Sequence, residues 1–191
     1  GNEISHISIA LNPMLCMSIP FVDGMDDYWT PEQETAIWLR LAHLMENPAV
    51  TKVFHNAAFD TAFMYRKMGI RCAPIECSMV AFAILMPDFP KGLDFLTSIY
   101  CGGEPYYKDD GKKYMKNPFG SEKTFQEYNA KDSCCCLESW LQIEQELHRQ
   151  GNWPFYCKQR DLIEPLTFMQ EHGIRMDVEG MQKAAEDAGR Q

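Results

Sequence analysis

Residues 4–11 and 14–19 are short runs of apolar or alternating apolar and polar residues on either side of the pair Asn12-Pro13. Two such runs around a turn-forming pair predict an antiparallel β-hairpin. Residues 30–33 then combine a threonine suited to an N-cap, a proline at the first helical position and a glutamine three residues after the cap. With the apolar stripe that follows, this pattern predicts a helix that runs to about residue 47.

The rest of the chain is mainly helical in pattern. A short apolar run at residues 51–54 predicts a buried strand, and residues 57–68 predict a helix that Gly69 can end in a left-handed conformation. Residues 70–72 predict a short extended piece. Further helices are predicted over residues 78–86, 92–100, 124–149 and 153–172, with a last one capped by Asp177. This order is typical of an α/β fold, although periodicity alone allows several α/β sheets.

The composition is that of a globular chain with one core. Of the 191 residues, 46% are hydrophobic, which is enough for one substantial core. A chain of this length is too short for a nuclease together with a complete polymerase. We therefore expect one domain over residues 1–150 and a helical linker over residues 151–191. No apolar run is long enough to cross a bilayer and no signal peptide is recognisable, so we expect a cytoplasmic protein without membrane contact.

The eight cysteines form no Cys-x-x-Cys pair. Cys134, Cys135 and Cys136 are consecutive in a predicted helix, so their side chains point in directions about 100° apart and cannot all bind one tetrahedral ion. We expect buried, reduced thiols.

The net charge of −9 argues against a protein that binds duplex DNA along a broad basic surface. The densest group of lysines is interleaved with aromatic residues between two predicted helices: Lys108, Lys112, Lys113, Lys116 and Lys123 with Tyr106, Tyr107, Tyr114 and Phe119. Such a mixture suits a loop that guides a nucleic acid strand. Nearby acids offset much of the charge, so a solvated loop is an equal alternative.

Two short segments deliver acidic side chains from helices. Asp60 lies in the first turn of the helix that begins where the strand at residues 51–54 ends. Tyr128 and Asp132 are four residues apart in a predicted helix, so the phenol and the carboxylate lie on one face, one turn apart. A carboxylate and a weak acid can therefore share one site. The ordinary alternatives are exposed helix acids and a half-buried tyrosine.

The segments His55-Asn56-Ala57-Ala58-Phe59-Asp60 and Tyr128-Asn129-Ala130-Lys131-Asp132 resemble the second and third motifs of the DEDD 3′–5′ exonucleases, Asn-x-x-Phe/Tyr-Asp and Tyr-x-x-x-Asp. The tyrosine form is similar to that of the DEDDy branch, which includes RNase D and the proofreading domain of family A DNA polymerases. Residues 91–96 resemble the helix between the motifs, and residues 162–177 resemble the segment that joins exonuclease and polymerase domains in family A enzymes. The resemblance implies a ribonuclease H-like fold, with a mixed central sheet flanked by helices.

One motif of that family is not in the sequence. Its first motif, Asp-x-Glu on the first and central strand, supplies two of the four carboxylates, and no Asp-x-Glu stands at the start of this chain. In the resemblance residues 3–9 match the strand after that motif, which leaves Glu3 as a weak substitute. We therefore expect a fragment that begins downstream of the motif and lacks the first central strand. Such a sheet has unpaired edges, so either the chain forms a homodimer or the neighbouring strands close the gap.

For the intact family the resemblance implies hydrolysis of the 3′-terminal phosphodiester of DNA with two divalent metal ions, Mg²⁺ or Mn²⁺. Asp132 would bind the metal that holds the attacking water, Asp60 would hold the second metal, and Tyr128 would orient the water. Asn56 would contact the terminal nucleotide and Phe59 would pack beneath the site. Two carboxylates cannot organise two metals, a water and a phosphate, so this chain alone is expected to have little or no activity.

Three hypotheses follow for the function. The first is the proofreading exonuclease domain of a phage or bacterial DNA polymerase, whose partners are a single-stranded DNA 3′ end and the polymerase domain of the same parent chain. The second is an RNase D-like exoribonuclease, and the third is a non-catalytic nucleic-acid-binding module with the same fold. The stretch at residues 173–177 favours the first over the second. The third depends on the missing Asp-x-Glu.

Overall fold

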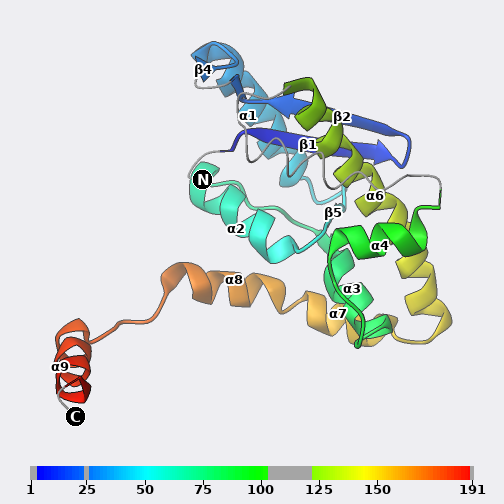
Figure 1. The fold of residues 1–191 in the computed structure, drawn as a ribbon. Coiled ribbons are helices and arrows are strands. Elements are labelled where there is room, and N and C mark those ends of the chain that lie inside the picture. The colour runs from blue at the N-terminus through cyan, green and yellow to red at the C-terminus, as the bar shows by residue number, and fades with distance from the viewer. Residues whose placement is uncertain (1–3, 24–25, 103–121, 190–191) are drawn as a thin grey trace.

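The chain folds into short strands and many helices, an α/β arrangement (Figure 1). The computed structural model describes residues 4–23, 26–102 and 122–189. The predicted hairpin is present: β1 (His6–Asn12) and β2 (Leu15–Pro20) are antiparallel, with Ile9 opposite Met17. At its turn the Asn12 side chain accepts a hydrogen bond from the backbone N–H of Met14 at 2.9 Å, as asparagine commonly does in tight turns.

A second antiparallel pair follows, β3 (Val22–Asp23) with β4 (Asp26–Asp27), which the sequence pattern does not predict. Helix α1 (Pro31–Met45) then begins as predicted. The N–H of Gln33 donates to Thr30 Oγ1 at 3.4 Å, and the N–H of Thr30 donates to Gln33 Oε1 at 3.0 Å. This reciprocal pair satisfies two backbone donors that a helix start would otherwise leave open.

A small parallel sheet is built from β5 (Lys52–Phe54) and β6 (Ile75–Cys77), and α2 (Ala57–Met68) lies between them in the chain. The predicted strand at Val53 and the predicted end of α2 at the left-handed Gly69 (φ 68°) are both confirmed. The extended piece expected at residues 70–72 is wrong in position, because the strand falls at residues 75–77. Only three residues pair there, so the pattern is too short to be recognised.

Two charged side chains are buried at this sheet. The Lys52 ammonium donates to three backbone carbonyls, and burial lowers its pKa. Glu76 accepts hydrogen bonds from the Tyr156 hydroxyl at 2.5 Å and from Arg160 at 2.7 Å. The Tyr156 oxygen in turn accepts from the backbone N–H of Cys77 at 2.9 Å. These contacts attach the segment after residue 150 to β6.

The main core lies where α3 (Ser78–Leu85), α4 (Leu93–Tyr100), α6 (Glu122–Arg149) and α7 (Trp153–Arg160) pack together. Its buried side chains are Ala81, Phe82, Leu96, Tyr100, Trp140, Ile143, Leu147 and Tyr156. Helix α6 is 28 residues long and also crosses the β1–β2 hairpin (Figure 1). It therefore connects the helical core with the strands.

The single helix expected over residues 153–172 is two helices, α7 and α8 (Ile163–His172). Pro165 explains the break, because it has no N–H and its ring would clash with the carbonyl of Asp161 in a continuous helix. Helix α9 (Val178–Ala188) is capped by Asp177 as predicted, has no buried residue and stands apart from the body (Figure 1). Within the described ranges, no helix has both the length and the apolar character needed to cross a bilayer.

The described strands form three two-stranded sheets instead of the one mixed central sheet that the sequence led us to expect. β1 pairs with β2, and β5 pairs with β6. No described strand lies between β1 and β5. Each of these two strands therefore has a described strand partner on one side only. The lysine-rich loop falls mostly on residues 103–121, outside the described residues.

Candidate active site

The predicted site residues come from two elements, the start of α2 and the first half of α6. β5 ends at Phe54 and α2 begins at Ala57, and Asn56 makes the turn between them in the left-handed conformation (φ 68°, ψ 53°). Among the described residues it is the only non-glycine with a positive φ. Asparagine tolerates this conformation better than most residues, at a cost of ~1 kcal/mol. The turn directs the chain into the helix that carries Asp60.

Asp60 is a carboxylate that the fold has partly removed from water. Burial raises its pKa from 3.8 to about 6, and a hydrogen bond from its own backbone N–H offsets only part of that effect. The positive end of a helix normally lowers the pKa of an acid in the first turn, so here the loss of hydration outweighs the helix dipole. No ion pair joins Asp60 to a cation of the described chain. The carboxylate is therefore both poorly hydrated and without an ion pair within the described chain.

The rotation of α6 about its axis is fixed by the hairpin. The hydroxyl of Ser8 donates to the backbone carbonyl of Asn129 at 2.8 Å, and the hydroxyl of Ser18 donates to Asn129 Oδ1 at 3.1 Å. Asp132 follows three residues later, and Cys136, one turn beyond it, is buried. Because Asn129 is held against β1 and β2, the direction in which Asp132 points is set as well.

Asp60 and Asp132 lie near one buried thiol. The pKa of Cys136 is raised to about 12, mainly by burial; a hydrogen bond with Ser78 lowers it, and the charges of Cys77, Asp60 and Asp132 raise it by smaller amounts. Two carboxylates that are 72 residues apart in the sequence therefore act on the same sulfur atom. The fold brings the second and third motif segments into one neighbourhood.

The two aromatic residues differ in their surroundings. Tyr128 is half-buried, stacks on Phe125 with ring centroids 6.0 Å apart and packs against two buried cysteines. Phe59 does not pack beneath the site as expected: its side chain is 64% exposed and stacks on Phe63. Adjacent helical side chains point about 100° apart, so the inward position of Asp60 leaves Phe59 on the outer face of α2.

The donor set fits a hard divalent ion in kind but not in number. Asp60 and Asp132 offer carboxylate oxygens, which Mg²⁺ and Mn²⁺ prefer, and a cation would offset the poorly hydrated charge of Asp60. Within the described part of the chain, however, no three His, Cys, Asp or Glu side chains gather as ligands. Glu3, the suggested substitute, lies outside that part.

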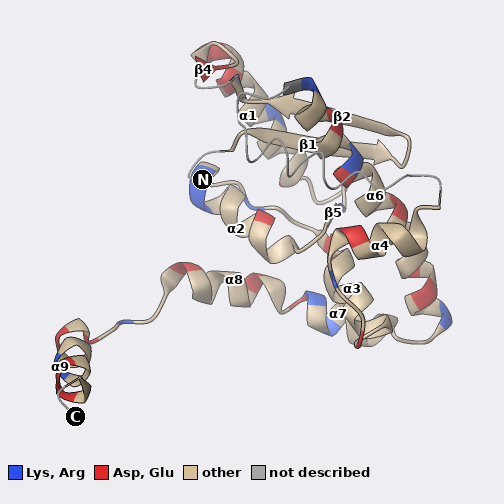
Figure 2. Ribbon diagram, viewed as in Figure 1, with Lys and Arg blue, Asp and Glu red and all other residues tan. Residues whose placement is uncertain are grey.

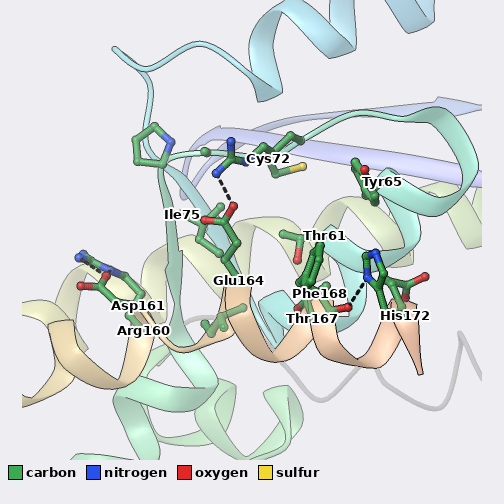
Figure 3. Close-up of a pocket in the computed structure, with 15 residues that line it drawn as sticks. Thr61, Tyr65, Cys72, Ile75, Arg160, Asp161, Glu164, Thr167, Phe168 and His172 are labelled. Carbon is green, nitrogen blue, oxygen red and sulfur yellow. Dashed lines mark hydrogen bonds and ion pairs between the residues drawn. The ribbon is translucent and has the colours of Figure 1, made fainter. Parts of the chain in front are cut away.

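A cavity of about 580 Å³ lies between α2 and α8 (Figure 3). Beside it, Arg66 of α2 forms an ion pair with Glu171 of α8, and Arg71, in the segment after α2, forms one with Glu164 of α8. Thr61 lines this cavity, but its neighbour Asp60 does not, and neither does any other predicted site residue. The cavity is therefore separate from the carboxylates, and we do not assign it as the active site.

Sequence reasoning missed a buried residue that lies between the two motif segments. Ser78, at the start of α3, is fully buried, and its hydroxyl oxygen lies 3.0 Å from His55 Nδ1 and 3.7 Å from Cys136 Sγ. Serine at a helix start usually indicates a cap, yet Cys77 holds the N-cap position of α3. No sequence signal distinguishes these two uses. His55, interpreted from the sequence only as a strand-end residue, is part of this contact.

The sequence profile of a family described as 3′-5′ exonuclease matches residues 11–148. The fold is similar to a solved structure described as the apo form of the nuclease, with a TM-score of 0.65, and to Brucella melitensis NrnC with bound Mg²⁺ and bound to pGG, each with a TM-score of 0.58. All three are 17% identical to this chain, and the similarity covers 91% of this chain and 86% of theirs. Identity at this level shows a shared fold. No curated protein matches the sequence significantly.

Proposed function

Because the chain belongs to the family of 3′-5′ exonucleases, we propose that its function is the metal-dependent removal of nucleotides from the 3′ end of a nucleic acid strand. One observation carries this proposal: the hydroxyl of Ser78 lies 3.0 Å from His55 Nδ1, in the segment that carries Asp60, and 3.7 Å from Cys136 Sγ, one turn after Asp132. Carboxylates that converge from distant segments are what two-metal hydrolysis of a phosphodiester requires. We also assign the fold as ribonuclease H-like, with β1, β2, β5 and β6 as four of its strands.

Each residue has a specific role in this proposal. Asp132 and Asp60 would hold two divalent ions, Mg²⁺ or Mn²⁺, which supply a polarised water and offset charge on the leaving 3′ oxygen. The Tyr128 phenol orients that water through a hydrogen bond, since its ordinary pKa of about 10 makes it a poor base near neutral pH. Asn56 would contact the terminal nucleotide, and the exposed ring of Phe59 would stack on a base.

The charge distribution supports a substrate held at its end. Lysine and arginine are scattered over the described elements and do not gather into a stripe (Figure 2), and the net charge is −9. A broad contact with duplex phosphates needs many basic residues. A frayed 3′ end can instead be held by metal ions and by base stacking.

Two substrates remain as candidates. The resemblance to proofreading domains favours a DNA 3′ end as substrate and the polymerase domain of a longer parent chain as protein partner. A second copy of this chain, in a homodimer, is the other protein partner we consider. The similarity to NrnC, which has been solved with Mg²⁺ and with pGG, instead favours an exonuclease that works without a polymerase. That supports the RNase D-like alternative over proofreading, and an RNA 3′ end is the substrate to test first.

The test compares matched RNA and DNA oligonucleotides of one sequence, labelled at the 5′ end so that each removed nucleotide shortens the product. It is run on the 191-residue chain and on a longer chain that carries an Asp-x-Glu strand before Gly1, each with Mn²⁺ or with a chelator. We expect stepwise shortening by the longer chain with Mn²⁺ and little or none by the 191-residue chain, because two carboxylates cannot hold two metals, a water and a phosphate.

Each outcome separates the hypotheses. Faster shortening of RNA supports the exoribonuclease, and faster shortening of DNA supports proofreading. Binding of either strand without any shortening in both chains would leave the non-catalytic module as the function. Full activity in the 191-residue chain would show that a further acid, first of all Glu3, completes the site.

A further inference from the structure

The junction between β6 and α3 lies between the two segments that carry the candidate carboxylates. Cys77 and Ser78 form this junction and are 1% and 0% exposed. The Cys77 thiol accepts a hydrogen bond from the backbone N–H of Ala57, the first residue of α2, at 3.5 Å. The helix that carries Asp60 is therefore anchored at its first N–H by a side chain of this junction.

The Ser78 hydroxyl extends the junction to the end of β5 and to α6. Its oxygen lies 3.2 Å from the backbone carbonyl of Phe54, 3.0 Å from His55 Nδ1 and 3.7 Å from Cys136 Sγ. A hydroxyl has one proton and two lone pairs. Donation to the Phe54 carbonyl, with acceptance from the Nδ1–H of His55, uses this capacity well and leaves a lone pair for the weak thiol donor.

We propose that Ser78 is a positioning residue of the exonuclease site, which sets the separation of Asp60 and Asp132. This proposal rests on the proposed function. The hydroxyl connects the turn that leads into the Asp60 helix with the residue one turn after Asp132. It touches neither carboxylate, so it acts through the backbone and Cys136.

The effect follows from the short range of metal coordination. Two carboxylates bind one ion together only if their separation is held to a fraction of an ångström. Loss of the buried hydroxyl removes the hydrogen-bonded connection between the end of β5 and α6, and it leaves the Phe54 carbonyl and the His55 ring without this partner. A structural role alone would lower thermal stability, whereas a positioning role also weakens metal binding in the protein that is still folded.

The chain offers a matched control. Ser139 lies on α6, is also 0% exposed and also contacts a thiol, that of Cys101 at 3.5 Å. Its hydroxyl makes no hydrogen bond with the described residues of β5 or α2. Ser78→Ala and Ser139→Ala therefore remove the same group from equally buried positions, and only the first disconnects the two motif segments.

The experiment measures free Mn²⁺ by electron paramagnetic resonance with the 191-residue chain, well below the melting temperature of each variant. Ser78→Ala should weaken Mn²⁺ binding by about tenfold, the loss typical when a residue that supports metal ligands is removed. Ser139→Ala should bind Mn²⁺ as the unaltered chain does, even if its melting temperature falls as far. Equal Mn²⁺ affinities of the Ser78→Ala variant and the unaltered chain would overturn the proposal.

Hydrogen exchange, read without metal, separates this proposal from the proposed function. In Ser78→Ala the peptides that contain Asp60 and Asp132 should both exchange faster, and in Ser139→Ala neither the Asp60 peptide nor Mn²⁺ affinity should change. If Asp60→Asn combined with Asp132→Asn leaves Mn²⁺ binding unaltered, the carboxylate site is wrong, whatever exchange shows. Unaltered exchange at both peptides in Ser78→Ala rejects the positioning role.

A second variant serves if Ser78→Ala fails to fold. Cys136→Ala removes only the α6 side of the contact, and it must show both weaker Mn²⁺ binding and faster exchange, to a smaller degree.

Discussion

Asp60 should destabilise the metal-free protein above about pH 6, so Asp60→Asn should make the protein more stable there. Burial raises the folded-state pKa of this carboxyl from 3.8 to about 6. A shift of about two units corresponds to ~3 kcal/mol. Because the side chain is partly buried and some of the charge is still screened by water, we expect a gain of ~1–2 kcal/mol from the substitution.

The pH window follows from the direction of the shift. Below about pH 4 the carboxyl is protonated in both the folded and the unfolded chain, so it contributes no pH dependence. Between about pH 4 and pH 6 the folded protein still holds a proton that the unfolded chain has released, so rising pH favours unfolding. Above about pH 6 the full penalty is present. The difference between Asp60→Asn and the unaltered chain should therefore open across this window and then stay constant.

Urea denaturation in chelator at about pH 4 and about pH 8 measures the difference, provided that the slope of the free energy against urea is the same in both proteins. Glu32→Gln is the control: Glu32 also lies in a first helical turn, but hydrogen bonds from its own backbone N–H and from Thr30 lower its pKa. Glu32→Gln should therefore lower the free energy of unfolding at about pH 8, where Asp60→Asn should raise it. Added Mn²⁺ should stabilise the unaltered chain and not Asp60→Asn. If Asp60→Asn is equally or less stable at about pH 8, the Asp60 carboxylate is hydrated or paired, which contradicts its proposed role.

Three further predictions concern the chemistry, the core and the thiols. In any form of the chain that degrades nucleic acid, Asp132→Asn should lower kcat about a thousandfold by removing a metal ligand, and Tyr128→Phe should lower it about tenfold with KM unchanged; single-turnover assays check this, and equal losses would contradict an orienting role for the phenol. Tyr156→Phe should lower the free energy of unfolding by ~2 kcal/mol, because the hydroxyl bonds two buried groups of β6; urea denaturation checks this, with the exposed Tyr65→Phe as control. A thiol-specific disulfide reagent should react with only the three half-buried cysteines of the native protein, since burial slows the others and raises the pKa of Cys72 to about 11; rapid reaction of all eight would refute this.

Most local structure could be predicted because its signals lie within a few residues. The hairpin needs only Asn12 and the alternation around it, and α1 needs the capping pair Thr30 and Gln33. Gly69 ends α2 in the left-handed conformation that the sequence predicts. Each of these is a rule about neighbouring residues, and tertiary packing agrees with it.

The predictions that were wrong or missing depend mainly on contacts between residues that are far apart in the sequence. β6 is a strand because three residues pair with β5, and its central Glu76 is buried only because Tyr156 and Arg160 reach it from α7. The break between α7 and α8 could have been predicted from Pro165, and the apolar periodicity obscured it. The burial of Ser78 between two distant segments has no local signal at all.

The same reasoning bears on the candidate site. Ser78 joins the two segments that carry Asp60 and Asp132. The motif resemblance predicts that these two residues belong together, and this stays a prediction. It could not predict that Phe59 would be 64% exposed, because a five-residue pattern does not say which face of α2 is covered. The residues that act through others, such as Ser78, become visible only in three dimensions.

The departures from ordinary helix and turn rules gather within a few residues of the first motif segment. Asn56 has a positive φ without making a side-chain cap, Asp60 keeps a poorly hydrated carboxylate in a first helical turn, and Phe59 exposes its ring on the same helix. Each costs stability or solubility, and none is needed to connect β5 to α2, which a glycine turn followed by a hydrated acid would do at lower cost. Local costs of this kind persist where a site requires them. An amide, an exposed ring and a poorly hydrated acid within five residues of one another are groups that suit the binding of a nucleotide and a metal. Their cost to the fold is the strongest physical reason to look for the chemistry at the start of α2.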